Sequence, residues 1–180
     1  MSTHSRLRGW LLFVCGSVSF GACAGAPHQV PFNESDFHSY AHAGAGVVKG
    51  HASTVTNDGY PVTANRSMTV YLLPKTAYTK EIVDREYIAG KPLSDPPAGA
   101  ARYIRKTQAD DHGDFVFHGV PSGDYYVSCR MISEVPTTVA VGDQPAVAST
   151  QTNMQWIFAS VQVGNAGLVN VGGWQRGMWH

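Results

Sequence analysis

Residues 107–127 constrain the fold of this chain more than any other segment, and they read T-Q-A-D-D-H-G-D-F-V-F-H-G-V-P-S-G-D-Y-Y-V. Asp110 and Gly113 predict a turn, because aspartate can bond its own backbone and glycine takes a positive φ at no steric cost. Phe115 and Phe117 then alternate with other residues at the period of two that is typical of a β-strand. The segment therefore predicts a β protein built around closely spaced turns.

A second turn and a second strand complete the segment. Pro121 and Gly123 predict the turn, and Tyr125 lies on one face of the strand that follows. An ordinary hairpin would explain the aromatic residues but not the whole order T-x-A-D-x-x-G-x-F-x-F-x-x-V-P-x-G-x-Y-x-V. That order resembles the signature of carboxypeptidase regulatory-like domains, which are transthyretin-like (prealbumin-like) β-sandwiches, close in shape to the B-type repeats of Gram-positive surface proteins. The resemblance implies an all-β, antiparallel β-sandwich, which we expect over residues 45–172.

The resemblance extends upstream of the signature. Residues 46–52 (G-V-V-K-G-H-A) resemble the family's first strand, residues 58–62 (D-G-Y-P-V) its first turn, and residues 68–74 (M-T-V-Y-L-L-P) its second strand. Such domains are accessory modules, so the resemblance implies a non-catalytic role in protein–protein interaction. Because one fold hosts many functions, the ligand or partner has to be argued from the residues of a site.

The first 23 residues predict an export signal. Arg6 and Arg8 precede an apolar run at 10–20, which is too short to span a membrane comfortably, and small residues follow it. Two cleavage sites compete there: F-G-A-C resembles a lipobox, with Phe20 where leucine is usual, and A-C-A fits an ordinary signal-peptidase site. We favour lipidation of Cys23. The chain would then lie on the periplasmic side of the outer membrane, since Ala24 rather than aspartate follows the cysteine; otherwise it would be periplasmic or secreted.

Residues 24–44 read as a tether between the signal and the sandwich. Asn33 could cap a short helical turn within it. His38 and His42 have the i, i+4 spacing of metal ligands on a helix, but no third ligand type accompanies them, so we expect no metal and no cofactor. Cys129, on an expected strand, predicts a buried structural thiol.

The long connection at 74–99 departs from the plain family pattern. A helix is predicted at 79–89, capped by Thr79 and ended at Gly90, and a proline-containing loop follows. Long loops on a rigid sandwich often carry binding sites, so this excursion is the candidate surface for a protein partner, with simple cover of a sheet edge as the alternative. Tyr78 and Tyr87 are candidate binding residues within it.

Towards the C-terminus, the alternation at 155–163 and the turn at 165–167 predict a terminal hairpin with residues 168–171. Residues 173–180 form a Gly- and Trp-containing tail without periodicity. Trp156, Trp174 and Trp179, with Tyr125 and Tyr126, could form a stacking platform for a polysaccharide. The competing interpretation, which we favour, is that these rings pack the core.

The remaining chemistry argues against catalysis and against nucleic acid. The chain has 13 basic and 13 acidic residues, and the basic residues form no continuous run, so a nucleic-acid partner is not expected. The chain lacks an H-x-x-E pair, a G-x-S-x-G elbow, and an H-x-H pair after Tyr126. An internal Lys49–Asn170 bond would need a buried acid, for which Glu86 and Glu134 are poor candidates. The sequence thus predicts a non-enzymatic envelope lipoprotein that binds a protein, with a carbohydrate-binding module as the alternative.

Overall fold

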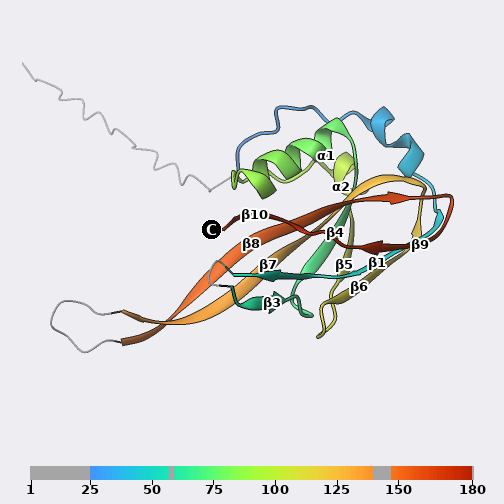
Figure 1. Ribbon diagram of the computed structural model, residues 1–180. Helices are drawn as coiled ribbons and strands as arrows, with labels where there is room; N and C mark the ends of the chain where they lie inside the picture. Colours follow the sequence, from blue (N-terminus) through green and yellow to red (C-terminus); the bar gives the residue numbers. More distant parts are fainter. Residues whose placement is uncertain (1–24, 57–58, 140–146, 180) are drawn as a thin grey trace, which may run out of the picture.

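The computed structural model describes residues 25–56, 59–139 and 147–179, so the signal segment and Cys23 lie outside the described residues. The described chain forms an all-β sandwich with a few short helices gathered on one side (Figure 1). The strands are β1 (Ala45–His51), β2 (Ser53–Val55), β3 (Pro61–Thr63), β4 (Thr69–Pro74), β5 (Arg105–Gln108), β6 (Asp114–Val120), β7 (Gly123–Val139), β8 (Val147–Val163), β9 (Ala166–Val171) and β10 (Gln175–Trp179). The helices are the 3₁₀ helix η1 (Glu34–Tyr40), α1 (Ala77–Ile82), the π-helix η2 (Val83–Ile88) and α2 (Ala98–Ala101).

Two sheets form the sandwich. The larger has the strand order β10-β8-β7-β4-β5, the smaller has the order β6-β1-β9, and β2 and β3 form a separate two-stranded pair. The named strands pair antiparallel except β1 and β9, which run parallel. Beyond the sandwich, β7 and β8 continue together as a long projecting ribbon (Figure 1).

The signature segment carries the chain between the two sheets and back. β5 belongs to the larger sheet, β6 to the smaller and β7 again to the larger, so each predicted turn connects two layers. In the first turn the Asp110 carboxylate accepts hydrogen bonds from the backbone N–H groups of His112 (2.8 Å) and Asp114 (2.9 Å). In the second, the buried Tyr125 hydroxyl donates to the Pro121 carbonyl oxygen at 3.0 Å. These polar bonds fix the two crossings.

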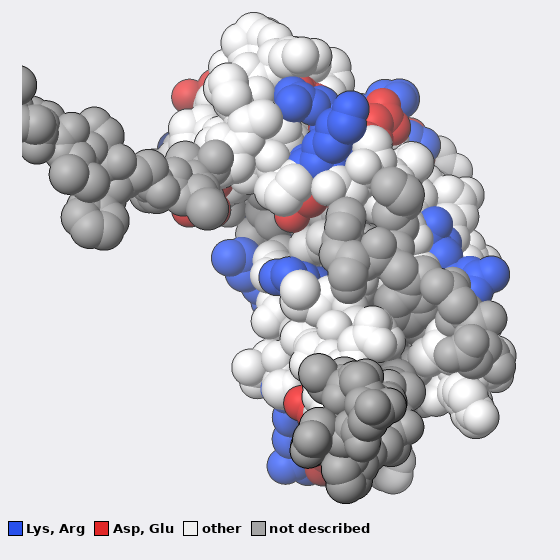
Figure 2. Space-filling model, turned by 90° about the vertical axis from the view of Figure 1, so that its left-hand side faces the viewer, with Lys and Arg blue, Asp and Glu red and all other residues white. Residues whose placement is uncertain are grey.

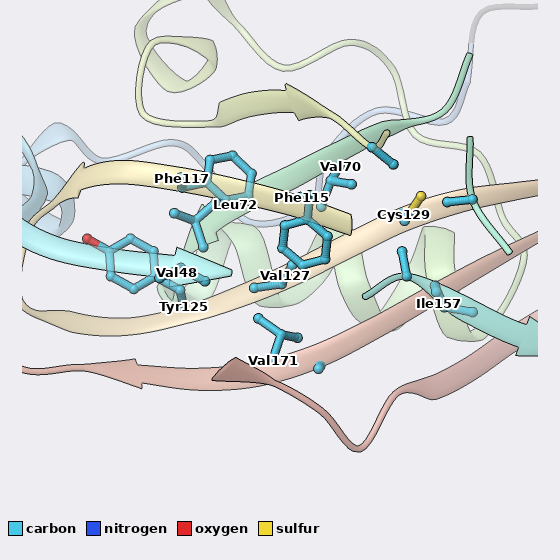
Figure 3. Packing of buried hydrophobic residues seen from close by; sticks show 14 of the residues in the cluster. Val48, Val70, Leu72, Phe115, Phe117, Tyr125, Val127, Cys129, Ile157 and Val171 are labelled. Atoms are coloured by element: carbon cyan, nitrogen blue, oxygen red, sulfur yellow. The ribbon is translucent and has the colours of Figure 1, made fainter. Parts of the chain in front are cut away.

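The first hydrophobic core lies between the sheets (Figure 3). Phe115 and Phe117 reach it from β6, and alternate residues of β4, β7 and β8 face them across the sandwich. Cys129 is fully buried there as a free thiol, as the sequence predicted. Burial raises the pKa of this thiol to about 12, so it is un-ionised and unreactive at neutral pH.

A second core lies on the outer face of the larger sheet. Leu73, Tyr126 and Phe158 point away from the first core, and the helices cover them with Phe37, Tyr78, Ile82, Val83, Tyr87 and Ala100. The larger sheet is therefore buried on both faces over this region. The helical excursion is a structural layer of the fold.

The helix of the excursion begins earlier than the sequence predicted. Thr76, not Thr79, is the N-cap: its hydroxyl accepts from the N–H of Thr79, while the Thr79 hydroxyl accepts from the N–H of Thr76. This reciprocal arrangement is a capping box in which threonine replaces the usual glutamate or glutamine. That replacement concealed the cap in the sequence.

Residues 25–44 lie against the domain and do not form the expected tether. We call them the N-terminal strap. Phe37, on η1, is fully buried in the second core, and Tyr40 packs edge-on against Tyr125 with ring centroids 5.2 Å apart. Asn33 caps η1 through its side chain, which accepts from the N–H of Ser35, as the sequence predicted.

The C-terminal hairpin and tail were predicted wrongly. β9 does not pair with β8; it crosses to the smaller sheet and lies beside β1. Its place beside β8 is taken by β10, which was expected to be an irregular tail. Pairing with β8 satisfies the backbone hydrogen-bonding groups of these residues. Backbone pairing does not require alternating apolar side chains, so the short glycine-containing segment showed no strand pattern in the sequence.

A turn separates the end of α2 at Ala101 from the start of β5 at Arg105, and β8 begins at Val147. Residues 140–146 lie outside the described residues.

Gly113 offers a test of the first crossing turn. Its φ is +85°, and an added Cβ would lie 2.6 Å from Cγ2 of Thr63 and 3.0 Å from the Ala52 carbonyl oxygen. Gly59 has the same φ with open space around it. Gly113→Ala should lower the free energy of unfolding by about 3 kcal/mol, and Gly59→Ala by about 1 kcal/mol, since only the first adds a clash to the backbone strain. Urea titrations of both variants measure the difference; equal losses would contradict the crowding of this turn.

Candidate functional site

Two cavities of the described chain adjoin one another between the larger sheet and the excursion. One has a volume of about 300 Å³ and the other about 370 Å³, and Glu86, Arg130 and Trp156 line both. We call the two together the groove. Its floor is the outer face of the larger sheet, where the helical cover ends, and its wall is formed by η2 and residues 93–96.

Four floor side chains alternate between aromatic and basic. Arg130 on β7 is directly opposite Trp156 on β8, and Lys106 on β5 is directly opposite Tyr71 on β4. The rings of Tyr71 and Trp156 lie 5.9 Å apart at 60°, and the Lys106 ammonium lies 5.5 Å from the centre of the Tyr71 ring. Cross-strand neighbours of this kind hold one another in place, so the floor is preorganised.

The wall side chains come from the π-helix η2. Tyr87 is buried and stacks on Trp156, with ring centroids 4.2 Å apart and an interplanar angle of 27°. Its hydroxyl accepts from Ser128 at 3.2 Å, and burial raises its pKa far above the ordinary value. One turn of π-helix is uncommon and is often found at functional sites. Tyr87 therefore packs against one side of Trp156, which is half-buried and lines the groove with the rest of its surface.

Glu86 reaches the groove from the same turn. Burial raises the pKa of its carboxyl, an effect that the nearby Arg130 partly opposes. The half-buried carboxylate can accept hydrogen bonds from a ligand hydroxyl.

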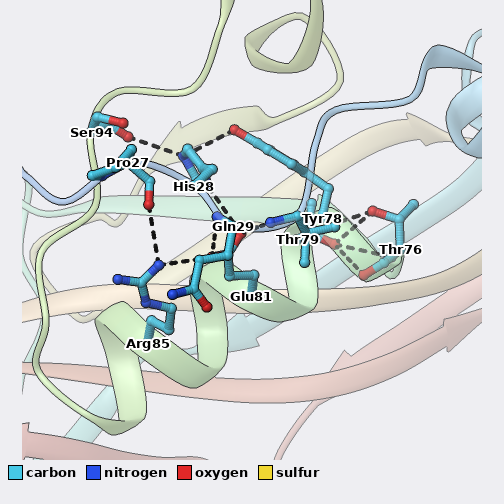
Figure 4. Close-up of polar contacts among 10 residues, drawn as sticks. Pro27, His28, Gln29, Thr76, Tyr78, Thr79, Glu81, Arg85 and Ser94 are labelled. Carbon is cyan, nitrogen blue, oxygen red and sulfur yellow. Dashed lines mark hydrogen bonds and ion pairs between the residues drawn. The ribbon is translucent and has the colours of Figure 1, made fainter.

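A network around Glu81 holds the strap, α1 and the groove wall together (Figure 4). The Glu81 carboxylate accepts from the backbone N–H groups of Gln29 (2.7 Å) and Val30 (3.0 Å) and from Arg85 (2.9 Å). His28 extends the network, because its Nε2 lies 3.1 Å from both the Ser94 carbonyl oxygen and the Tyr78 hydroxyl. The strap thereby fixes residue 94, which lines the groove.

The aromatic platform, which was the less favoured interpretation of the sequence, is not assembled among the described side chains. Tyr125 packs between the sheets, Tyr126 and Tyr78 lie in the second core, and of the tryptophans Trp156 alone lines the groove among the described side chains. Trp174 packs against Phe115 on the smaller sheet and donates from Nε1 to the His51 carbonyl oxygen at 2.8 Å. Trp179 pairs through its backbone with Gln155, and its side chain lies outside the described residues.

Sequence reasoning missed Tyr71, Lys106 and Arg130. Tyr71 and Trp156 each occupy the alternate positions of their strands that face outward, and this alternation could be read from the sequence. Which strands are neighbours in the sheet could not be read, so the sequence did not show that Lys106 and Arg130 lie beside these rings.

The other candidate chemistries are not assembled among the described residues. His38 and His42 lie on the surface strap, and the described part of the chain holds no group of three potential metal ligands. Lys49 and Asn170 are indeed neighbours on β1 and β9, but both are exposed, whereas Glu86 lies in the groove and Glu134 is exposed on the ribbon. On the face shown in Figure 2, basic and acidic side chains are interspersed and form no continuous basic stripe. No helix in the described residues is long and apolar enough to cross a membrane.

Comparison with known proteins places the fold. No protein-family model matches the chain, and the curated proteins give no match. A solved structure from Pseudomonas aeruginosa, described as a "putative carbohydrate binding protein", is similar with a TM-score of 0.57 and 24% sequence identity, over 79% of this chain and 97% of that one. At this identity the likeness shows a shared fold.

The Glu81 network predicts a pH-dependent stability. Burial alone would raise the pKa of this carboxyl, but the bonds from Gln29, Val30 and Arg85 and the nearby His28 lower it from 4.5 to about 2. Because the folded pKa lies below the unfolded one, the carboxylate stabilises the fold above about pH 4.5, and this contribution is lost as the pH falls towards 2. Glu81→Gln should therefore lower the free energy of unfolding by roughly 3 kcal/mol at pH 7, and by much less at pH 2.

Asp84→Asn is the matched control, since this exposed carboxylate lies one turn away and pairs only with Lys80 among the described residues. Urea unfolding of each variant at pH 7 and at pH 2 gives the comparison. An Asp84→Asn loss as large as that of Glu81→Gln would rule out a special role for the buried network.

Proposed function

We propose that this chain is a non-catalytic glycan-binding module and that the groove is its binding site. The observation that carries the proposal is the half-buried Trp156, held against Tyr87 and flanked by Arg130 and Glu86. A sugar ring has an apolar C–H face and a rim of hydroxyls. An aromatic plane bordered by charged hydrogen-bonding groups matches both surfaces.

The size of the groove agrees with this proposal. Each cavity falls within or close to the range of small-molecule sites, which span roughly 300–1,000 Å³. The name of the structurally similar P. aeruginosa protein, which concerns carbohydrate binding, supports the same function.

Trp156→Ala tests this proposal. The change should weaken glycan binding at least tenfold, because truncating a central tryptophan costs about 2 kcal/mol or more at typical binding sites. Tyr60→Ala is the control, since Tyr60 is 68% exposed and does not line the groove. A glycan array identifies binders, calorimetry measures both variants, and urea unfolding verifies that each is folded. Glycan binding that survives Trp156→Ala unchanged would refute the groove as the site.

The protein-partner hypothesis from the sequence stays a prediction. The carboxypeptidase regulatory-like resemblance implies it, and the excursion was its expected surface. The large apolar side chains of its helices, Tyr78, Ile82, Val83 and Tyr87, instead face the second core, although Ile88 is 46% exposed. Capture of one envelope protein in equal amount, with no glycan bound on the array, would favour this hypothesis over glycan binding.

We further propose that the chain is exported and anchored through a lipid on Cys23, on the sequence argument alone. Cys23→Ser should move the protein from the membrane fraction to the soluble fraction and abolish palmitate labelling in growing cells. Cys15→Ser, in the apolar part of the signal segment, is the matched control and should change neither. Palmitate labelling that persists in Cys23→Ser would contradict the lipobox assignment.

A further inference from the structure

The basic and acidic side chains of the groove come from different secondary-structure elements. The floor contributes the cations, Lys106 from β5 and Arg130 from β7, whereas the wall contributes the carboxylates, Glu86 from η2 and Asp95 from the following loop. Neither cation has a carboxylate within 4.0 Å among the described residues, and neither do these carboxylates have a basic partner there. The opposing charges face the same space without joining each other.

Arg130 is placed to hold an anion. Among the described residues its hydrogen-bond partner is the Met154 sulfur, 2.9 Å from Nη2, and thioether sulfur is a weak acceptor. The rest of the guanidinium fork is therefore available, and its planar geometry suits a carboxylate bound through two oxygens. Arg130 stands directly opposite Trp156 in the sheet, so a ring stacked on the indole would bring a substituent within its reach.

The wall imposes a second requirement. Glu86 and Asp95 accept hydrogen bonds but cannot donate them when ionised, so the ligand side facing them must carry donors such as hydroxyls. A neutral sugar would meet this condition but would leave both floor cations without an ion-pair partner within 4.0 Å. A bare polyanion would satisfy the floor but would bring like charge against the wall, which disfavours binding.

We propose that the preferred ligand of the groove is a glycan containing uronic acid units, with the sugar carboxylate on Arg130 and Lys106 and the hydroxyls towards Glu86 and Asp95. This inference rests on the proposed glycan-binding function and names its substrate class. The two cavities share Trp156, Glu86 and Arg130, so the bound segment extends past these residues on both sides and comprises more than one sugar unit.

The experiment compares three probes by calorimetry on the full chain. Trigalacturonate carries hydroxyls and carboxylates, its carboxyl-reduced counterpart carries hydroxyls alone, and tripolyphosphate carries negative charge without hydroxyl-rich rings. Trigalacturonate should bind at least about tenfold more tightly than either of the others, and its affinity should fall as salt is raised.

Variants locate the interaction. Arg130→Gln should weaken trigalacturonate binding by about tenfold or more and change binding of the carboxyl-reduced trisaccharide less than about twofold. Lys75→Gln is the control, because Lys75 is exposed and lies over Tyr126, outside the groove. Trp156→Ala should weaken both trisaccharides.

The outcomes separate the inference from the function beneath it. Equal affinity for both trisaccharides, lost in Trp156→Ala, would overturn the uronic acid assignment and leave glycan binding in place. Tripolyphosphate binding as tight as trigalacturonate would overturn it in favour of a plain anion site. Failure of every saccharide, on the array as well as in calorimetry, would overturn the proposed function itself.

Discussion

The outer face of the larger sheet carries apolar side chains that must be removed from water, and much of the architecture follows from this constraint. Leu73, Tyr126 and Phe158 alternate with residues that fill the first core, so the same strands supply two apolar surfaces. The smaller sheet covers one surface. The excursion covers the other, and the strap closes over it with the fully buried Phe37. Burying side chains of this size contributes roughly 1.5–3 kcal/mol each, enough to hold short helices that would not persist alone.

The groove begins where this cover stops. Along β7 the outer-face residues change from Tyr126, under the helices, through the buried Ser128 to the exposed Arg130. Trp156 lies at the same boundary, packed by Tyr87 behind it and bordered by the cavities in front. The structural layer and the candidate site are thus two parts of one arrangement, and the Glu81 network ties the wall to the strap and to α1.

The sequence predicted the parts of this fold whose causes are local. Asp110, Gly113 and the alternating phenylalanines encode a turn and a strand within ten residues, and the Asn33 cap is equally local. It did not predict that β9 would join β1 or that residues 175–179 would pair with β8, because strand partners are chosen by the packing of the whole sandwich. The same reason hid the groove: Trp156 was a candidate from its type alone, whereas Arg130 and Lys106 gained meaning only when strand order brought them to aromatic neighbours.

The packing of the strap limits how far the domain could lie from a membrane if Cys23 carried a lipid anchor. A free 21-residue tether would let the domain range up to about 70 Å from the bilayer at roughly 3.3–3.6 Å per residue. Ala26 is instead bridged to Leu93 beside the groove, so three Cα steps, at most about 11 Å, separate it from Cys23. A lipid there would hold the groove wall close against the leaflet. The domain would then sample polymers lying on the membrane surface rather than those in the space beyond it.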